Sequence, residues 1–282
     1  VGNLFAFADL NSRHLQVHFL NVGQGDAILV NIKNDRWLID GGPDRKVVEE
    51  LDQELPLFDR RLAGIILTHP HADHVAGLIE VLRRYKVGAV VISPATHTTP
   101  EYLSFLSEIK KQNIATKIVD HPFKWTGQMG DRAWEWKFIY PNSAGAANVS
   151  DLNDASVVSQ LTFGQTSFLF MGDAGEDIEK ILLKQNQFSP VDVLKGGHHG
   201  SSTATSYEFL KIVKPDWAVI MSGRENSYGH PSVATLSRLA SFGARILRTD
   251  TDPSISFISD GDSVKRLDDE QGIMVIIDKT LA

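Results

Sequence analysis

Three histidines and an aspartate lie within six residues of one another where an apolar run meets a helical pattern. The run "GIIL" leads into "THPHADHVAG". In an extended segment residues i and i+2 share a face, so His69 and His71 can chelate one ion, while the turn into the helix directs Asp73 and His74 toward a second point. Imidazole and carboxylate suit Zn²⁺, Mn²⁺ or Fe. One such residue alone is more simply a loop histidine or a helix cap. The cluster predicts a metal site at the end of a core strand.

Strand-like and helical patterns alternate along the chain. "LQVHFL", "AILVNI" and "RWLID" read as strands, and "PDRKVVEELDQEL" reads as a helix with one apolar face. From about residue 130 the alternation resumes with β-meanders inserted, as in "AWEWKFIY", "SVVSQLTF" and "TSFLFMGD", and "GIMVIID" reads as a closing strand. The pattern predicts an α/β sandwich of two sheets with outer helices. Residues 1–13 are predicted to be a linker, and residues 14–282 one domain.

Composition excludes several classes of site. The chain has no cysteine, which excludes disulfides, thiolate zinc sites and cysteine nucleophiles. Its formal net charge is −7, whereas proteins that bind polyanions by neutralising phosphates are normally basic. We therefore expect a polyanion to be attracted only through local positive charge, such as a bound metal. No window approaches about 18 uninterrupted apolar residues, so no membrane-spanning segment is predicted. Because the sequence starts without Met, we expect a part of a longer chain.

Polar residues also follow other predicted strands. Asp40 ends "LIDGG", Asp173 lies in "FLFMGDAG", and His198 and His199 lie in "LKGGHHGSS". Each aspartate also has a simple structural explanation, since Asp40 can initiate a turn and Asp173 can cap a helix. The paired histidines are expected to point apart in their glycine-flanked turn, so they cannot do the same job.

These motifs together resemble the metallo-β-lactamase superfamily. "HPHADH" matches its HxHxDH motif, and Asp40, Asp173 and "HHGS" follow in the superfamily's order. The resemblance covers about residues 15 to 268 and implies an αββα sandwich of two mixed β-sheets flanked by helices. Within the superfamily, "FLNVGQGDAILV", "KGGHHGS" and "SYGHPS" resemble the C-terminal domain of the ComEC competence (DNA-uptake) proteins. Asn21 departs from that pattern, which usually has aspartate at this position.

The resemblance implies two divalent metal ions, Zn or Mn. The implied ligands are His69 and His71 for the first ion, Asp73, His74 and His199 for the second, and Asp173 shared between both. Asp40 is implied to accept a hydrogen bond from a ligand imidazole, behind the metals. Many superfamily enzymes have a further histidine on the first ion where this chain has Asn153. Asn153 is then either a weaker ligand, better matched to Mn²⁺, or a loop residue.

Other residues are implied to act on the substrate. Asp73 is expected to contribute to catalysis as well as to metal binding, and His198 to contact a phosphate or protonate a leaving group, unless it only supports a ligand. His230 in "YGHPS" is either a phosphate contact, a general acid or a surface histidine. The resemblance places Gln24 and Asp26 at the active-site rim, although a hairpin also explains the glycines beside them. Ser201 is either a phosphate contact or a helix cap.

The resemblance implies a metal-dependent phosphodiesterase, the hydrolase domain being residues 14–282. Its expected function is that of a nuclease domain degrading one DNA strand during natural transformation, with single-stranded DNA as the substrate. The expected location is extracytoplasmic (periplasmic), beside the membrane channel portion of the same inner-membrane protein. One alternative is a phosphoesterase for a small or polymeric phosphate ester, similar to phosphorylcholine esterases. The other is a catalytically silent interaction module with the same fold, which the Asn153 position leaves open.

Overall fold

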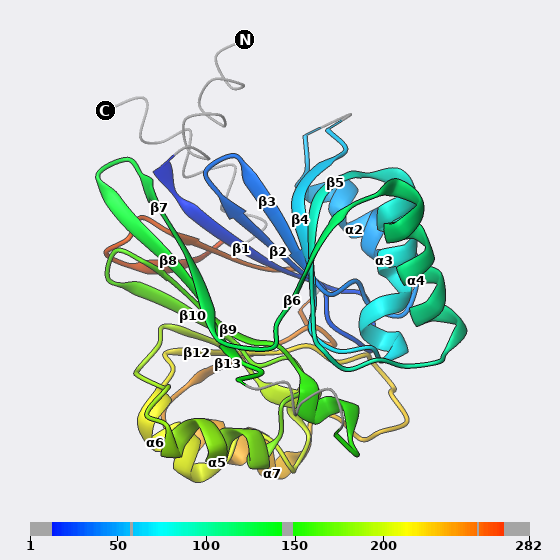
Figure 1. Cartoon of the computed structure of the whole chain (residues 1–282). Helices are drawn as coiled ribbons and strands as arrows, with labels where there is room; N and C mark the ends of the chain where they lie inside the picture. Colours follow the sequence, from blue (N-terminus) through cyan, green and yellow to red (C-terminus); the bar gives the residue numbers. More distant parts are fainter. Residues whose placement is uncertain (1–12, 57–58, 143–148, 253, 268–282) are drawn as a thin grey trace.

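The computed structural model describes residues 13–56, 59–142, 149–252 and 254–267. In this part of the chain, two mixed β-sheets pack face to face and helices cover their outer faces (Figure 1). This αββα sandwich confirms the fold class expected from the sequence. The predicted linker (residues 1–13, apart from Arg13) and the predicted strand "GIMVIID" lie outside the described residues.

The first sheet, as described, has eight strands in the order β15-β14-β1-β2-β3-β4-β5-β6. The pairs from β3 to β6 are parallel, and the others are antiparallel. In chain order the strands are β1 (Leu15–Leu20), β2 (Ile28–Ile32), β3 (Asp35–Ile39), β4 (Arg61–Leu67), β5 (Lys86–Ile92), β6 (Ala115–Ile118), β14 (Ser254–Ser259) and β15 (Val264–Leu267).

The second sheet, within the same ranges, has seven strands in the order β13-β12-β11-β10-β9-β8-β7. Its pairs from β10 to β13 are parallel, and those from β7 to β10 are antiparallel. The strands are β7 (Phe123–Met129), β8 (Arg132–Tyr140), β9 (Val158–Phe163), β10 (Thr166–Phe170), β11 (Val193–Lys195), β12 (Trp217–Ile220) and β13 (Arg245–Arg248).

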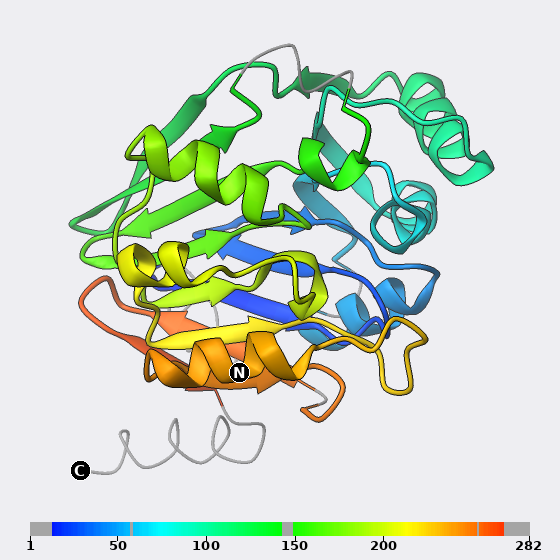
Figure 2. The same ribbon diagram turned by 90° about the horizontal axis from the view of Figure 1, so that it is seen from below.

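Amphipathic helices cover the two outer faces. Figures 1 and 2 show one set of helices on the outer face of the first sheet and another set on that of the second. None of the helices in the described ranges is long and apolar enough to cross a membrane. The helices are α2 (Lys46–Glu54), α3 (Ala72–Arg84), α4 (Pro100–Gln112), α5 (Glu176–Lys184), α6 (Tyr207–Val213) and α7 (Val233–Ser241), and two short 3-10 segments are η2 (Leu152–Ala155) and η3 (Gly197–Gly200).

Aromatic side chains fill much of the space between the sheets. Trp136 is fully buried at the centre of this layer, and its ring lies 5.7 Å from that of Phe138 and 6.4 Å from that of Phe170. The indole Nε1 donates a hydrogen bond to Ser159 Oγ at 3.1 Å, so the buried polar atom is satisfied. This packing holds the sheets, and therefore the loops at their ends, in one arrangement.

The parallel strands of both sheets bring the polar motifs together. Asp40 follows β3, the histidine-rich loop follows β4, Asp173 follows β10 and His199 follows β11. In open α/β sheets, ligand sites form beyond the carboxyl ends of parallel strands. The fold therefore places motifs that are far apart in sequence at one end of the sandwich.

Strand β7 was not among the predicted strands. Pro122 precedes it and Gly127 interrupts it, and both residues weaken a strand pattern. The structure explains the glycine, because a Cβ at Gly127 would lie 2.6 Å from the ring of Trp134 on β8. Cross-strand packing against β8 therefore overrides the local sequence signal here.

Candidate metal centre

The histidine-rich loop joins β4 to α3. His69 Nε2 lies 3.0 Å from His71 Nδ1 and 4.0 Å from Asp173 Oδ2, so His69 contacts His71 and faces Asp173. His69 is fully buried, whereas His71, which precedes the first residue of α3, remains half-exposed. The structure thus brings the i and i+2 histidines together and places His69 near Asp173, whereas His71 belongs to none of the groups of donors within 4.8 Å of one another in the described part of the chain.

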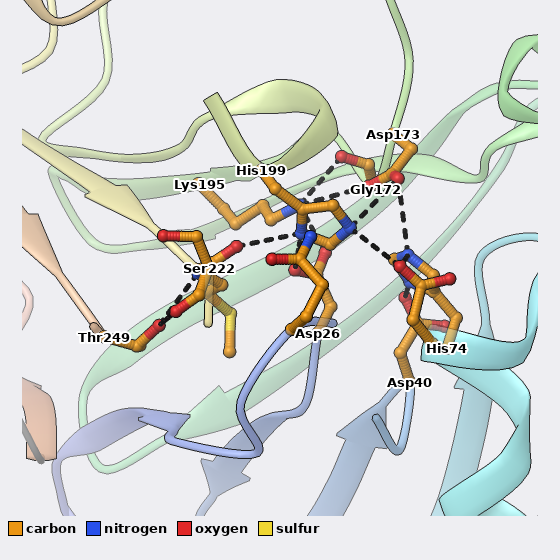
Figure 3. A network of polar contacts seen from close by, with 12 residues as sticks. Asp26, Asp40, His74, Gly172, Asp173, Lys195, His199, Ser222 and Thr249 are labelled. Carbon is orange, nitrogen blue, oxygen red and sulfur yellow. Dashed lines mark hydrogen bonds and ion pairs between the residues drawn. The ribbon is translucent and has the colours of Figure 1, made fainter. Parts of the chain in front are cut away.

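The donors expected for the second ion also converge on Asp173. His74 Nε2 lies 3.4 Å from Asp173 Oδ2, and His199 Nε2 lies 3.2 Å from the same oxygen. His199 Nε2 is also 3.3 Å from Asp73 Oδ2. Figure 3 shows His74 and His199 approaching Asp173 from different elements. Donor atoms of Asp73, His74 and His199 lie within 4.8 Å of one another, as do those of His69, His74 and Asp173.

The chemistry of these donors fits a metal ion. His74 Nε2 and His199 Nε2 are buried, and neither has a hydrogen-bond partner within the described part of the chain. A buried polar atom without a partner costs about 1–3 kcal/mol. Imidazole and carboxylate converging without thiolates match Zn²⁺ or Mn²⁺, so a divalent cation would satisfy atoms that the protein itself leaves unpaired.

The electrostatic field of the cluster also favours a cation. Burial lowers the pKa values of His74 and His199, but nearby carboxylates, Asp173 foremost, outweigh burial and raise both pKa values well above the ordinary range. Burial raises the pKa of Asp173, but His199 and His74 hold it well below its usual value. In contrast, burial and then the charge of His74 lower the pKa of His69, which favours the neutral imidazole that binds metals.

Asp40 orients one of the histidines. Its Oδ2 accepts hydrogen bonds from His74 Nδ1 at 2.8 Å and from Thr68 Oγ1 at 2.7 Å, and its Oδ1 accepts one from Thr68 N at 2.7 Å. With Nδ1 held as the donor, Nε2 of His74 is left free and faces Asp173. His199 is oriented in the same way, since its Nδ1 donates to the backbone oxygen of Met221 at 2.8 Å.

The paired histidines leave their turn in different directions. Both adopt left-handed backbone conformations, His198 with φ 47° and His199 with φ 51°, which cost about 1–3 kcal/mol each for residues other than glycine. His199 is only 2% exposed and faces Asp73 and Asp173. His198 is half-buried, and its ring lies 5.6 Å from that of His230. The strained turn thus directs His199 toward the buried carboxylates and His198 toward His230.

Lys195 lies in the candidate site although the sequence motifs assign it no role. It ends β11 and is 1% exposed; its Nζ contacts the Asp26 carboxylate, donates to the Gly172 backbone oxygen at 2.9 Å and lies 3.6 Å from Asp173 Oδ1 (Figure 3). A lysine is almost never fully buried unless its charge is paired. It is the first residue of "KGGHHGS", at the carboxyl end of a strand and four residues before His199.

Asp26 lies deeper than the sequence indicates. Expected at the rim, it is 1% exposed, contacts Lys195, and its Oδ1 lies 3.3 Å from His199 Nδ1. Because its charge pairs with a buried lysine, Asp26 supports the donors from behind, which corrects its expected place. A Cβ at Gly25 would lie 2.1 Å from the Asp73 backbone oxygen, so only glycine allows this approach. Gln24 is half-exposed, and its Oε1 accepts a hydrogen bond from Gly223 N at 3.0 Å.

The roles of Asn153 and Ser201 stay predictions. Asn153 lies in η2, near Ser156, whose Oγ is 3.4 Å from His69 Nδ1. Asn153 Oδ1 is buried and has no hydrogen-bond partner among the residues that the structure describes, which is consistent with a metal ligand. The Ser201 hydroxyl lies 3.0 Å from Thr203 Oγ1 and accepts a bond from Thr203 N, while Ser206 caps α6.

Comparisons with known proteins agree with this geometry. The chain is 27% identical to "ComE operon protein 3" of Bacillus subtilis (strain 168) over 272 residues, which are 90% of this chain and 34% of that protein. It is 29% identical to "Competence protein ComA" of Neisseria gonorrhoeae over 241 residues, 84% of this chain and 31% of that protein. The chain therefore spans about a third of the length of these relatives.

The fold also has solved counterparts. The crystal structure of the metallo-beta-lactamase fold protein YhfI from Bacillus subtilis matches with a TM-score of 0.52 at 14% identity, covering 84% of this chain and 96% of that one. The sequence profile described as "Metallo-beta-lactamase superfamily" matches residues 20–224, well over half of the chain. Most members of that superfamily are hydrolases that use divalent metals. The profile match, together with the sandwich fold and the histidine-rich loop of this chain, establishes that the chain belongs to the metallo-β-lactamase superfamily.

Proposed function

We propose that the chain is a metal-dependent phosphodiesterase, and that residues 14–282 form the nuclease domain of a DNA-uptake protein cleaving single-stranded DNA. The observation that carries the hydrolase part is the convergence of His74 and His199 on Asp173 Oδ2, with both Nε2 atoms buried and unpaired among the described residues. "Competence protein ComA" matches 84% of this chain, and its name supports the proposal that the substrate is DNA.

In the proposed mechanism the donor set would hold two divalent ions. Bound metal lowers the pKa of water from about 15.7 to about 7 and neutralises phosphoryl oxygens. The hydrogen bond to Asp40 directs His74 Nε2 toward Asp173. Lys195 Nζ attracts Asp173 Oδ1, so the other carboxylate oxygen, Oδ2, faces the imidazoles. The ligands are His69, His71, Asp173 and Asn153 for the first ion, and Asp73, His74, Asp173 and His199 for the second.

Two histidines outside the donor set serve the substrate in this proposal. The rings of His198 and His230 lie 5.6 Å apart, both side chains are half-buried, and the ring of His198 is 6.2 Å from that of His199. This position beside the donors allows them to contact a phosphate oxygen, and it allows His198 to deliver a proton to the leaving oxygen. Gln24 holds the loop that carries His230 through its bond to Gly223.

The cellular setting is part of the same proposal. The matched relatives are about three times as long as this chain, which leaves room in such proteins for a membrane channel. We place this domain on the extracytoplasmic, periplasmic side of an inner membrane, where it meets the incoming DNA strand.

Two substrates separate the proposed nuclease from its alternatives. With Mn²⁺ or Zn²⁺ added, we expect the protein to cleave both a single-stranded oligonucleotide and bis-p-nitrophenyl phosphate, and a chelator to stop both reactions. Gel analysis and nitrophenol absorbance measure the two activities. Cleavage of the small ester alone would indicate a phosphoesterase instead. Bound metal without either activity would indicate a silent module.

The paired histidines give a second prediction. His199→Ala removes a buried donor 3.2 Å from Asp173 Oδ2, so it should lower the bound metal per chain. His198→Ala leaves every donor in place, and it should retain metal while lowering turnover by about 10²- to 10⁴-fold, the range for a general acid. Elemental analysis and steady-state kinetics on both variants measure this difference. The reverse pattern would exchange the two roles.

A further inference from the structure

Four rings form a continuous series from the metal centre to the protein surface. Successive ring centroids lie 6.2 Å apart from His199 to His198, 5.6 Å from His198 to His230, and 6.0 Å from His230 to Tyr228. Exposure rises along the series from 2% at His199 to 68% at Tyr228. Tyr228 is the most exposed of the large aromatic side chains in the described part of the chain.

The loop holds Tyr228 in place although its ring is exposed. Asn226 Nδ2 donates to the backbone oxygens of Gly223 at 2.9 Å and His230 at 2.5 Å. Asn226 Oδ1 accepts from Tyr228 N at 3.1 Å and His230 N at 3.0 Å. The Tyr228 ring is parallel to that of His230, with an interplanar angle of 16°. The tyrosine is thus a fixed, exposed platform, and ordering it on binding costs little conformational entropy.

Positive charge lies next to the same loop. A cavity of about 470 Å³ beside Gly223 and Asn226 is lined by Lys46 and Arg224, and neither forms a salt bridge within the described ranges. A carboxylate in its lining, Asp250, is neutralised by Arg248, which donates to it at 2.9 and 2.5 Å. Lys46 and Arg224 therefore place positive charge at a cavity beside the loop that carries Tyr228, a combination suited to a strand with both phosphates and bases.

We propose that Tyr228 is a stacking subsite for a base of single-stranded nucleic acid, flanking the nucleotide whose phosphate lies at the metal centre. This subsite deepens the proposed nuclease function and rests on it. Aromatic stacking tolerates any sequence, because every base has a π face. A phosphate ester without a neighbouring base cannot use the subsite, so Tyr228 makes the enzyme prefer polynucleotides over small esters.

The test compares Tyr228→Ala with the wild-type protein on a thymidine oligonucleotide. We expect KM for the oligonucleotide to rise about 5- to 150-fold, the range that corresponds to losing one base–aromatic stack. The ratio of kcat/KM for the oligonucleotide to that for bis-p-nitrophenyl phosphate should fall by a similar factor. Tyr228→Trp should restore the ratio, since it restores a π surface. The matched control is Tyr207→Ala. It removes a 49% exposed tyrosine at the first residue of α6, where the ring packs against Phe242, and it should change neither value.

An oligonucleotide with abasic positions beside the cleaved bond identifies the contact. On this substrate Tyr228→Ala should match the wild type, because the base is already missing, and bound metal measured by elemental analysis should equal the wild-type value. An unchanged KM for Tyr228→Ala on the intact oligonucleotide overturns the stacking subsite and leaves the nuclease proposal standing. If the wild-type protein cleaves no oligonucleotide, the nuclease proposal fails and the subsite fails with it.

Discussion

Asp173→Asn is expected to remove bound metal and to lower phosphodiester turnover by about a thousandfold or more. The substitution keeps the volume of the side chain but replaces the charged Oδ2, which faces His69, His74 and His199, with part of a neutral amide. A metal supplies several kcal/mol of charge stabilisation in the transition state, and each 1.36 kcal/mol corresponds to about tenfold in rate. Elemental analysis and steady-state kinetics measure both losses.

Asp177→Asn provides a matched control for this variant. Asp177 lies only four residues further along the chain, is 80% exposed and pairs with Lys180 on the surface of α5. We expect it to retain metal and turnover, because an exposed ion pair contributes little. Full activity in a correctly folded Asp173→Asn protein, checked by circular dichroism, would show that the reaction takes place elsewhere.

Lys195→Met is expected to lower the free energy of unfolding by about 3–5 kcal/mol. The side chain keeps its length but loses the charge that pairs with Asp26 and faces Asp173 Oδ1 at 3.6 Å. Removing one partner of a buried ion pair leaves the other charge desolvated and uncompensated, which accounts for this magnitude. Urea denaturation, with the slope compared between variants, measures the change.

Two further variants test the cause of that loss. Lys180→Met removes a lysine from exposed pairs on α5 and should leave the free energy of unfolding nearly unchanged. The double variant with Asp26→Leu and Lys195→Met should recover part of the stability, because it removes both buried charges together. If Lys195→Met unfolds at the wild-type urea concentration, the buried pair is energetically unimportant.

The local parts of the metal centre are the parts that the sequence predicts best. His69, His71, Asp73 and His74 lie in one short segment, so strand and helix periodicity alone place them at a strand end. The helix predicted over "PDRKVVEELDQEL" is α2 (Lys46–Glu54) in the structure, because its apolar residues recur at helical spacing.

The long-range parts depend on the packing of the two sheets. Nothing in the local pattern shows that Asp173 faces His69, and only the resemblance to a family indicates it. Lys195 ends β11 of the second sheet, whereas Asp26 lies in the loop between β1 and β2 of the first sheet, so their pairing requires the folded structure. The exposed Tyr228 carries no periodic signal, because its position depends on side-chain bonds of Asn226 within an irregular loop.

The donors of the candidate metal centre are divided between the two sheets, so the donor set is complete only when both sheets have packed together. The first sheet supplies His69, His71, Asp73 and His74, and the second supplies Asp173 and His199. Each half of the sandwich alone therefore holds an incomplete set of donors, and metal bound across both halves adds its binding free energy to the stability of the assembled chain. If the proposed function holds, an incompletely folded chain lacks a complete donor set and is inactive.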